Sequence, residues 1–502
     1  MIKSKILMKK YILFLLLSLL LSGQLPVTAQ EDERYVPETD PLVLKKLDEW
    51  QDLKFGLLMH WGTYSQWGIV ESWSICSEDE PWCKRNNPDY VEYKVDYENL
   101  QATFNPVDFD PGRWAKAAKN AGMKYVVFTT KHHDGFCMFD TKLTDYKITS
   151  RKTPFHTNPG ANIAKEVFNA FRAEGLWAGA YFSKPDWHSE YYWWPNFATP
   201  DRNPNYDISK YPERWENFVQ FTQGQIMELV GGDYGKLDIL WLDGGQVQKH
   251  NEEDVYRYID QIRKMPREDV YKYIMSTGYK YSKIQSQDIR MDELVAKVRE
   301  KQPGMIVVDR AVYGRNQNYL TPENRVPDHA LPYPWESCIV AGESWSWKPD
   351  AKYISSTEAV HMLVDIVIKG GNLLLNIGPG PQGQWHDEAY KLLEDIGTWM
   401  KVNGEAIYGT RALAPYKEGK VCISKKGDHT QYIYYLADEN EQMPDKIMMS
   451  NHSIPAGAKL EVLGTKGNIK WQKRDNGFLV SIPEKIRKAP PSEYVWVIKV
   501  NY

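Results

Sequence analysis

Between about residue 50 and residue 405, short apolar runs alternate with segments whose apolar residues recur at helical spacing. Six of the runs have the length of β-strands, and they cover residues 55–60, 125–131, 177–183, 237–243, 305–310 and 372–377. The helix-like segments between them cover residues 112–121, 163–174, 213–230, 357–369 and 387–402. This alternation predicts an α/β fold with a parallel sheet covered by helices. With two weaker strands near Ile274 and Ile339, it predicts a barrel of (β/α)₈ type.

After about residue 410 the pattern changes to short alternating runs separated by Gly, Asn, Asp and Pro. These runs, residues 420–424, 431–436, 459–463, 478–482 and 494–500, predict a small C-terminal antiparallel β-sandwich. We therefore expect a catalytic barrel over residues 30–410 and a sandwich over residues 411–502. Three long segments, residues 64–99, 191–205 and 310–334, lack regular periodicity, and loops of such length are typical of functional sites.

The N-terminus has the pattern of an export signal. Lysines precede an apolar run at residues 11–21, and small residues follow where signal peptidase cleaves. We expect a signal peptide over residues 1–29, a mature protein that begins near Gln30, and a periplasmic or secreted location. No later apolar run approaches the length of a membrane span, so we expect no membrane insertion of the mature protein.

Composition narrows the class of ligand. The net charge of −4 without a basic block argues against nucleic acid as a partner. The chain has 19 Trp and 32 Tyr against 15 Phe, and an excess of amphipathic aromatics suits sugar faces and hydroxyls, although aromatics also pack cores. Five cysteines are too few for a disulfide framework. Cys76 and Cys83 could pair within one loop, but buried thiols without a redox role fit the count better.

Polar groups cluster where the predicted strands end, which is where barrel enzymes carry their active sites. The strand ends read Met59–Gly62, Lys131–Gly135, Phe182–His188, Trp241–Gly245, Val308–Arg310 and Asn376–Pro379. The spacings of metal sites, serine nucleophiles and phosphate loops do not occur there, so we expect no metal and no cofactor. What remains is carboxylate chemistry among His, Arg and Trp, as in a glycosidase.

Asp243 is the strongest catalytic candidate. It ends a buried strand and precedes Gly244 and Gly245, which let a ligand approach the backbone closely. A carboxylate held on a rigid strand suits attack at an anomeric carbon. The alternative hypothesis is that Asp243 has only a structural role and caps the turn that follows the strand.

These motifs resemble the glycoside hydrolase family 29 α-L-fucosidases. The blocks that carry the resemblance include His60-Trp61-Gly62, the run from Lys131 to Cys137, Leu240–Asp243, Val308-Asp309-Arg310, Pro334-Trp335-Glu336 and the run from Gly371 to Pro379. The resemblance covers about residues 50–410. It implies a barrel with a C-terminal sandwich, a retaining two-step mechanism without a metal, and a fucosylated glycan as substrate.

By position, the resemblance gives Asp243 the role of nucleophile and places a set of pocket residues. These are His60, His132, His133, Tyr181, Trp241, Arg310 and Trp345. Glu323 in Thr321-Pro322-Glu323 is similar to the family's general acid/base, with Asp309, Glu336, Glu343 and Glu71 as rivals.

The sequence departs from the family pattern in two places. It has Ala311 after the Asp-Arg pair, and Glu343-Ser344-Trp345-Ser346-Trp347 where Ser-Trp-Gly-Tyr is usual. Both departures concern the leaving-group side. An exo-glycosidase for a related sugar such as a galactoside is therefore an alternative hypothesis. A catalytically silent sugar-binding protein is a second alternative, but it would require the loss of Asp243 or of the acid/base, and both carboxylates are present. The sequence does not predict linkage preference or oligomeric state.

Overall fold

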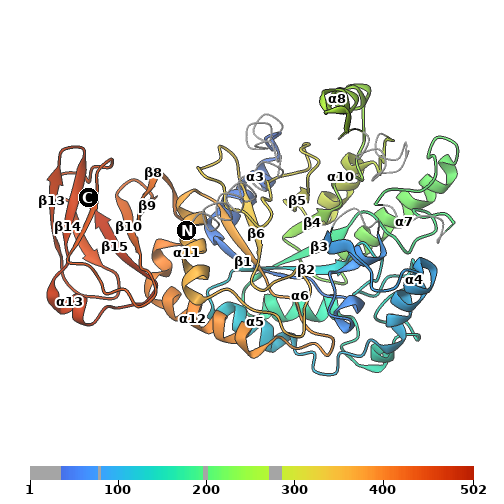
Figure 1. Ribbon diagram of the computed structural model, residues 1–502, viewed down its shortest axis with the longest axis horizontal. Coiled ribbons are helices and arrows are strands. Elements are labelled where there is room, and N and C mark those ends of the chain that lie inside the picture. Colours follow the sequence, from blue (N-terminus) through green and yellow to red (C-terminus); the bar gives the residue numbers. More distant parts are fainter. Residues whose placement is uncertain (1–34, 77–80, 196–201, 269, 271–284) are drawn as a thin grey trace, which may run out of the picture.

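The computed structural model describes residues 35–76, 81–195, 202–268, 270 and 285–502. The predicted signal peptide and the weak strand near Ile274 lie outside these residues. Figure 1 shows an elongated molecule, with a parallel α/β domain at one end and the C-terminal sheets at the other. Among the described residues, no helix combines the length and the apolar character needed to cross a membrane.

A parallel sheet of seven strands forms the centre of the larger domain, in the order β5-β4-β3-β2-β1-β7-β6. Its strands are β1 (Phe55–Met59), β2 (Tyr125–Lys131), β3 (Trp177–Ser183), β4 (Ile239–Asp243), β5 (Ile306–Asp309), β6 (Glu336–Val340) and β7 (Asn372–Asn376). Nearly every residue of these strands is buried. Burial on both faces explains why the strands appear in the sequence as continuous apolar runs.

Helices separate the strands along the chain, and most of them pack against the outer face of the sheet (Figure 1). They are α3 (Pro41–Leu53), α4 (Tyr90–Asn99), α5 (Pro111–Asn120), α6 (Ile163–Ala173), α7 (Pro212–Val230), α8 (Glu252–Lys264), α10 (Met291–Lys301), α11 (Ser356–Ile368) and α12 (Asp387–Asn403). Caps define several ends: Asp110 accepts from the amide of Arg113, and Ser355 forms a capping box with Glu358. Ala115 and Ala118 of α5 are buried, as the helical spacing predicted.

An irregular segment, residues 316–324, connects the two edges of the sheet, and we call it the bridging segment. Its first part bonds to β5, where the amide of Asn318 donates to the Val307 carbonyl at 2.9 Å. Its second part bonds to β6, where the amide of Asn324 donates to the Cys338 carbonyl at 2.9 Å. The bridging segment therefore occupies the position of an eighth strand between β5 and β6 without being a regular strand.

The C-terminal part consists of two antiparallel sheets. One has the order β12-β15-β10-β9-β8 and the other β11-β14-β13. The strands are β8 (Arg411–Glu418), β9 (Val421–Lys426), β10 (Thr430–Leu436), β11 (Lys446–Met449), β12 (Lys459–Val462), β13 (Lys470–Arg474), β14 (Gly477–Ser481) and β15 (Val495–Asn501). The short helix α13 is Glu484–Lys488. A separate apolar core, which includes Ile423, Ile433, Phe478, Val480 and Ile498, lies within this part.

The predicted fold class is confirmed: a barrel-type parallel α/β domain precedes antiparallel C-terminal sheets. The weak strand near Ile339 is β6, so the described residues supply seven strands where eight were expected. The prediction that residues 64–99 lack regular structure was wrong, because this stretch contains α4. The alternation of tyrosines and charged residues in α4 gives almost no apolar face, and this explains the error.

Candidate active site

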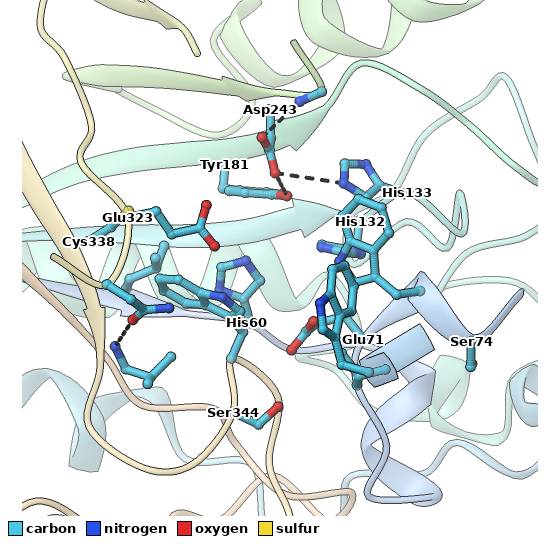
Figure 2. A pocket seen from close by; sticks show the side chains of 18 of the residues that line it. His60, Glu71, Ser74, His132, His133, Tyr181, Asp243, Glu323, Cys338 and Ser344 are labelled. Atoms are coloured by element: carbon cyan, nitrogen blue, oxygen red, sulfur yellow. Dashed lines mark hydrogen bonds and ion pairs between the residues drawn. The ribbon is translucent and has the colours of Figure 1, made fainter. Parts of the chain in front are cut away.

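A cavity of about 900 Å³ opens at the carboxyl ends of the strands. All nine residues predicted for the site line this cavity: His60, His132, His133, Tyr181, Trp241, Asp243, Arg310, Glu323 and Trp345. They come from β3, β4 and the bridging segment, and from the loops that follow β1, β2, β5 and β6. Figure 2 shows Asp243, Glu323 and Glu71 entering the cavity from different sides, with the imidazoles between them.

The Asp243 carboxylate is held by several donors. The Tyr181 hydroxyl donates to Oδ2 at 2.7 Å, while Nη1 of Arg310 and the amide of Gly244 donate to Oδ1 at 3.0 and 2.8 Å. Burial by itself would raise the pKa of Asp243, but the Arg310 charge and these donors outweigh it and hold the pKa well below its usual range. Asp243 is therefore an ionised carboxylate, which is the state that a nucleophile requires.

Arg310 connects the two predicted catalytic carboxylates. One Nη atom donates to Asp243, and the other donates to Oε2 of Glu323. Backbone bonds on either side of Glu323 fix its position, because the Pro322 carbonyl and the Asn324 amide both pair with Cys338 of β6. The Glu323 side chain is 43% exposed, so water and a leaving group can reach it.

The three imidazoles are neutral groups in a buried wall. Burial lowers the pKa of His60 and of His133 to about 4, and holds the pKa of His132 well below its usual range. Nδ1 of His60 lies 3.0 Å from Oδ1 of Asn376, an acceptor, so this nitrogen carries the hydrogen and Nε2 is an acceptor. Nδ1 of His132 lies 2.5 Å from the Ser72 hydroxyl. Neutral imidazoles suit hydrogen bonds to the hydroxyls of an uncharged sugar.

Aromatic rings form the floor of the cavity. Tyr181 stacks on Trp241 with ring centroids 5.2 Å apart, and His60 lies 5.2 Å from the ring of Trp345. The carbonyl of Trp345 accepts from the Asn376 side-chain amide at 2.8 Å. Asn376 therefore positions both His60 and Trp345 from the end of β7.

Geometry separates the rivals for the acid/base role. Asp309 is buried and accepts from Nζ of Lys184 at 2.5 Å, and Glu336 is buried below the floor with the Tyr125 hydroxyl 2.6 Å away. Neither lines the cavity, whereas Glu71 and Glu343 do. Glu71 is almost fully buried, its Oε1 accepts from the amide of Ser346 at 2.6 Å, and burial raises its pKa to about 7.

An aromatic wall extends from the catalytic centre toward the cavity mouth. Trp73 lies 4.9 Å from His133 and 5.2 Å from Trp82, measured between ring centroids. The Arg202 guanidinium lies 5.0 Å from the Trp73 ring and 5.7 Å from the Trp82 ring. Trp82 is 47% exposed, so the outer part of this wall is open to a ligand.

Comparison of the whole chain with known proteins identifies its family. A family model described as Alpha-L-fucosidase matches residues 24–405. The chain belongs to the alpha-L-fucosidase family. Curated relatives of this fucosidase include the human tissue alpha-L-fucosidase, 27% identical over 97% of this chain and 96% of the relative. The alpha-L-fucosidase of Branchiostoma floridae is 26% identical over 97% of this chain and 99% of the relative.

Solved fucosidases share the arrangement of both domains. Isoenzyme 1 from Paenibacillus thiaminolyticus superposes with a TM-score of 0.67 at 29% identity, over 92% of this chain and 99% of that chain. The Thermotoga maritima alpha-fucosidase superposes with a TM-score of 0.68 at 24% identity, over 95% and 99% of the two chains. The family resemblance stated from the motifs is therefore confirmed.

Several residues of this fucosidase site received no role from the sequence, or only a different one. Ser72, Trp73 and Arg202 lie in the long loops, and only the length of those loops signalled a functional role. Asn376 was quoted within a motif but received no role, although its place at the end of a buried strand is the same signal that identified Asp243. Glu71 was considered only as an acid/base rival.

Proposed function

We propose that this family member is a retaining exo-glycosidase that releases α-L-fucose from glycans, with Asp243 as nucleophile and Glu323 as general acid/base. The observation that carries the assignment is the Arg310 guanidinium, which contacts both carboxylates with its two Nη atoms. Two carboxyl groups that share one guanidinium are close together, as a double displacement requires. In support of retention, a Bacteroides thetaiotaomicron fucosidase of the same fold has been captured as a trapped covalent intermediate.

In the first step, a carboxylate oxygen of Asp243 attacks the anomeric carbon of fucose. The bond from that carbon to the glycosidic oxygen breaks, and Glu323 gives its proton to the departing oxygen. In the second step, Glu323 takes a proton from water, the water oxygen attacks the same carbon, and Asp243 leaves as a carboxylate. Glu323 must be released from Arg310 before the first step, because the acid role needs a protonated carboxyl.

The three buried imidazoles that line the cavity account for the choice of sugar. His60, His132 and His133 are neutral and buried, so they can pair with hydroxyls without attracting an anion. Glu71 adds a buried carboxyl to the same wall. Hydrogen bonds between buried protein groups and sugar hydroxyls discriminate strongly between sugars. A sugar that leaves one buried group unpaired loses that hydrogen bond, while the group's desolvation cost remains uncompensated.

The decisive experiment compares azide products of two variants on an activated aryl α-L-fucoside. In Asp243→Gly, azide replaces the nucleophile and should give β-fucosyl azide. In Glu323→Ala, azide attacks the covalent intermediate and should give α-fucosyl azide, while turnover of natural glycans fails. Glu71→Ala and Glu343→Ala are the matched controls, and α-fucosyl azide from either of these in place of Glu323→Ala would move the acid/base role there.

Two further measurements test the activity and the location. Wild-type enzyme should release α-fucose as the first product in an NMR time course, and an aryl β-galactoside should be turned over far more slowly. Export follows from the signal pattern, so we expect the processed chain, beginning near Gln30, outside the cytoplasm. An N-terminus that still contains residues 1–29 in the purified native protein would contradict this.

A further inference from the structure

A second hollow lies beside the active-site cavity. It has a volume of about 630 Å³ and is lined by Gln66, Trp67, Ile69, Asn86, Asn87, Tyr93 and Asp96. We call it the Trp67 groove. Ile69 lines both hollows, and the next residues along the chain, Val70 and Glu71, line the active-site cavity. A single short stretch of backbone, residues 66–71, therefore separates the groove from the site where fucose is cleaved.

The aromatic surface of the groove is held in place from below. The Trp67 ring lies 5.4 Å from the Tyr93 ring and 5.8 Å from the Tyr97 ring, the second contact being edge to face. Both tyrosines are buried, whereas Trp67 is 37% exposed. A large indole that is fixed on one side and open on the other is a surface on which a sugar ring can stack.

The polar residues of the groove are largely pre-ordered. The Gln66 amide donates to the Leu100 carbonyl at 2.8 Å, and the Asn87 amide donates to Glu92 at 3.0 Å. Asn86 and Asp96 are exposed at the rim and present donors and acceptors to a ligand. Groups that are already ordered lose little side-chain entropy on binding.

The charge of the lining defines the class of ligand. Among the described residues that line the groove, Asp96 is the one carboxylate and there is no Lys or Arg. An anionic sugar or a phosphate would meet only a like charge there. An uncharged sugar can stack on Trp67 and bond to the amides and to Asp96.

We propose that the Trp67 groove binds uncharged hexose or N-acetylhexosamine units of the same glycan from which the active site removes fucose. The identity of that glycan rests on the proposed function. The groove then acts as a remote subsite that recognises branched or extended glycans, and short fucosides do not reach it.

Kinetics on two substrates test the proposal. Trp67→Ala should raise KM for a fucosylated neutral oligosaccharide of four or more units about tenfold with little change in kcat, because the lost contact is uniform binding. An aryl fucoside should give the same kcat/KM as wild type within about twofold. Trp67→Tyr should restore most of the affinity. Trp194→Ala is the matched control, since Trp194 is 36% exposed and lines neither hollow.

A binding measurement keeps the proposal separate from the activity. A neutral oligosaccharide without fucose should bind to wild type in an NMR titration, and should lose that binding in Trp67→Ala and in Asn86→Ala. Asn86 is on the surface, so its variant folds even if Trp67→Ala does not. The proposal is overturned if both variants bind the oligosaccharide like wild type. If the wild-type protein does not hydrolyse an aryl fucoside, that result would instead overturn the proposed function.

Discussion

Arg310 is the residue on which the ionisation of Asp243, the proposed nucleophile, depends. In Arg310→Gln the burial of Asp243 acts without an opposing charge, so the pKa of Asp243 rises. The acid limb of the pH profile of kcat/KM should then move to higher pH, because less carboxylate is present at low pH. The rate at neutral pH should fall about a hundredfold or more. Arg310→Lys keeps the positive charge but cannot contact both carboxylates at once. It should therefore lower the rate, but shift the acid limb of the pH profile less than Arg310→Gln does.

Glu336 gives a pH dependence to stability rather than to chemistry. It is the first residue of β6, it is fully buried, and the Tyr125 hydroxyl, the Tyr319 side chain and the Trp241 side chain face it. Burial raises its pKa to about 7. For a carboxyl whose pKa is raised in the folded state, stability is complete below the unfolded-state pKa, falls as the pH increases toward about 7, and levels off above that.

Glu336→Gln should therefore gain stability relative to wild type as the pH rises. Melting temperatures of both proteins between about pH 5 and pH 9 measure this, and the two curves should separate as the pH rises to about 7 and keep a constant gap above it. Glu343→Gln, at an exposed position, should run parallel to wild type. Parallel curves for Glu336→Gln would show that Glu336 does not hold a proton in the folded protein.

At the scale of elements, one buried ion pair connects the ends of β3, β4 and β5. Nζ of Lys184, just after β3, donates to Asp309 at 2.5 Å and to the Val247 carbonyl at 2.9 Å. The Lys184 amide donates to the Asp243 carbonyl at 2.9 Å, and Asp309 directly precedes Arg310. The pair thus fixes the backbone of both the nucleophile and its guanidinium.

Breaking the pair on one side should be costly. Lys184→Met leaves the Asp309 charge buried without its partner, and should lower the free energy of unfolding by about 3–5 kcal/mol in denaturant titrations. The double variant Lys184→Met/Asp309→Leu should recover much of that stability. Its kcat should nevertheless stay low, because the strand ends are no longer tied together. Full recovery of kcat in the double variant would mean that the ion pair has no positioning role.

The elements also show what the sequence could predict. The six strong strands lie within two residues of their predicted bounds, because buried parallel strands are continuous apolar runs bounded by turns. Asp243 was predictable for the same reason, as the polar end of such a run. The position of Glu323 beside Arg310 depends on backbone hydrogen bonds between the bridging segment and β6. These are tertiary contacts, and no local sequence pattern indicates them. The aromatic wall of Trp73, Trp82 and Arg202 is likewise made only by tertiary contacts.

At the scale of the whole molecule, the two parts share a core. The apolar cluster of the barrel continues through Tyr432, Tyr434, Val495 and Val497 of the C-terminal sheets. The indole of Trp399 in α12 donates to the Val495 carbonyl at 2.8 Å. Burial of this kind resembles one domain core rather than a joint between independent units.

The full chain should therefore unfold in a single calorimetric transition. A chain that ends at residue 410 should be insoluble or aggregate in size-exclusion chromatography, since the faces of α11 and α12 that contact β8, β9 and β15 become exposed apolar surface. Two separate transitions, or a soluble and active fragment ending at residue 410, would contradict this prediction.

The bridging segment has a consequence for how such enzymes diversify. Asp243 lies on a strand with a partner on each side, so its surroundings tolerate few insertions without loss of the barrel. Glu323 lies on an irregular stretch between Asp309 and Glu336, which isolated bridges rather than a continuous ladder hold to β5 and β6, so a change of length between those bridges need not shift the register of the paired strands. We therefore expect fucosidases of this fold to differ in their preference for the departing sugar mainly through this one connection, with the strand that carries Asp243 left unchanged.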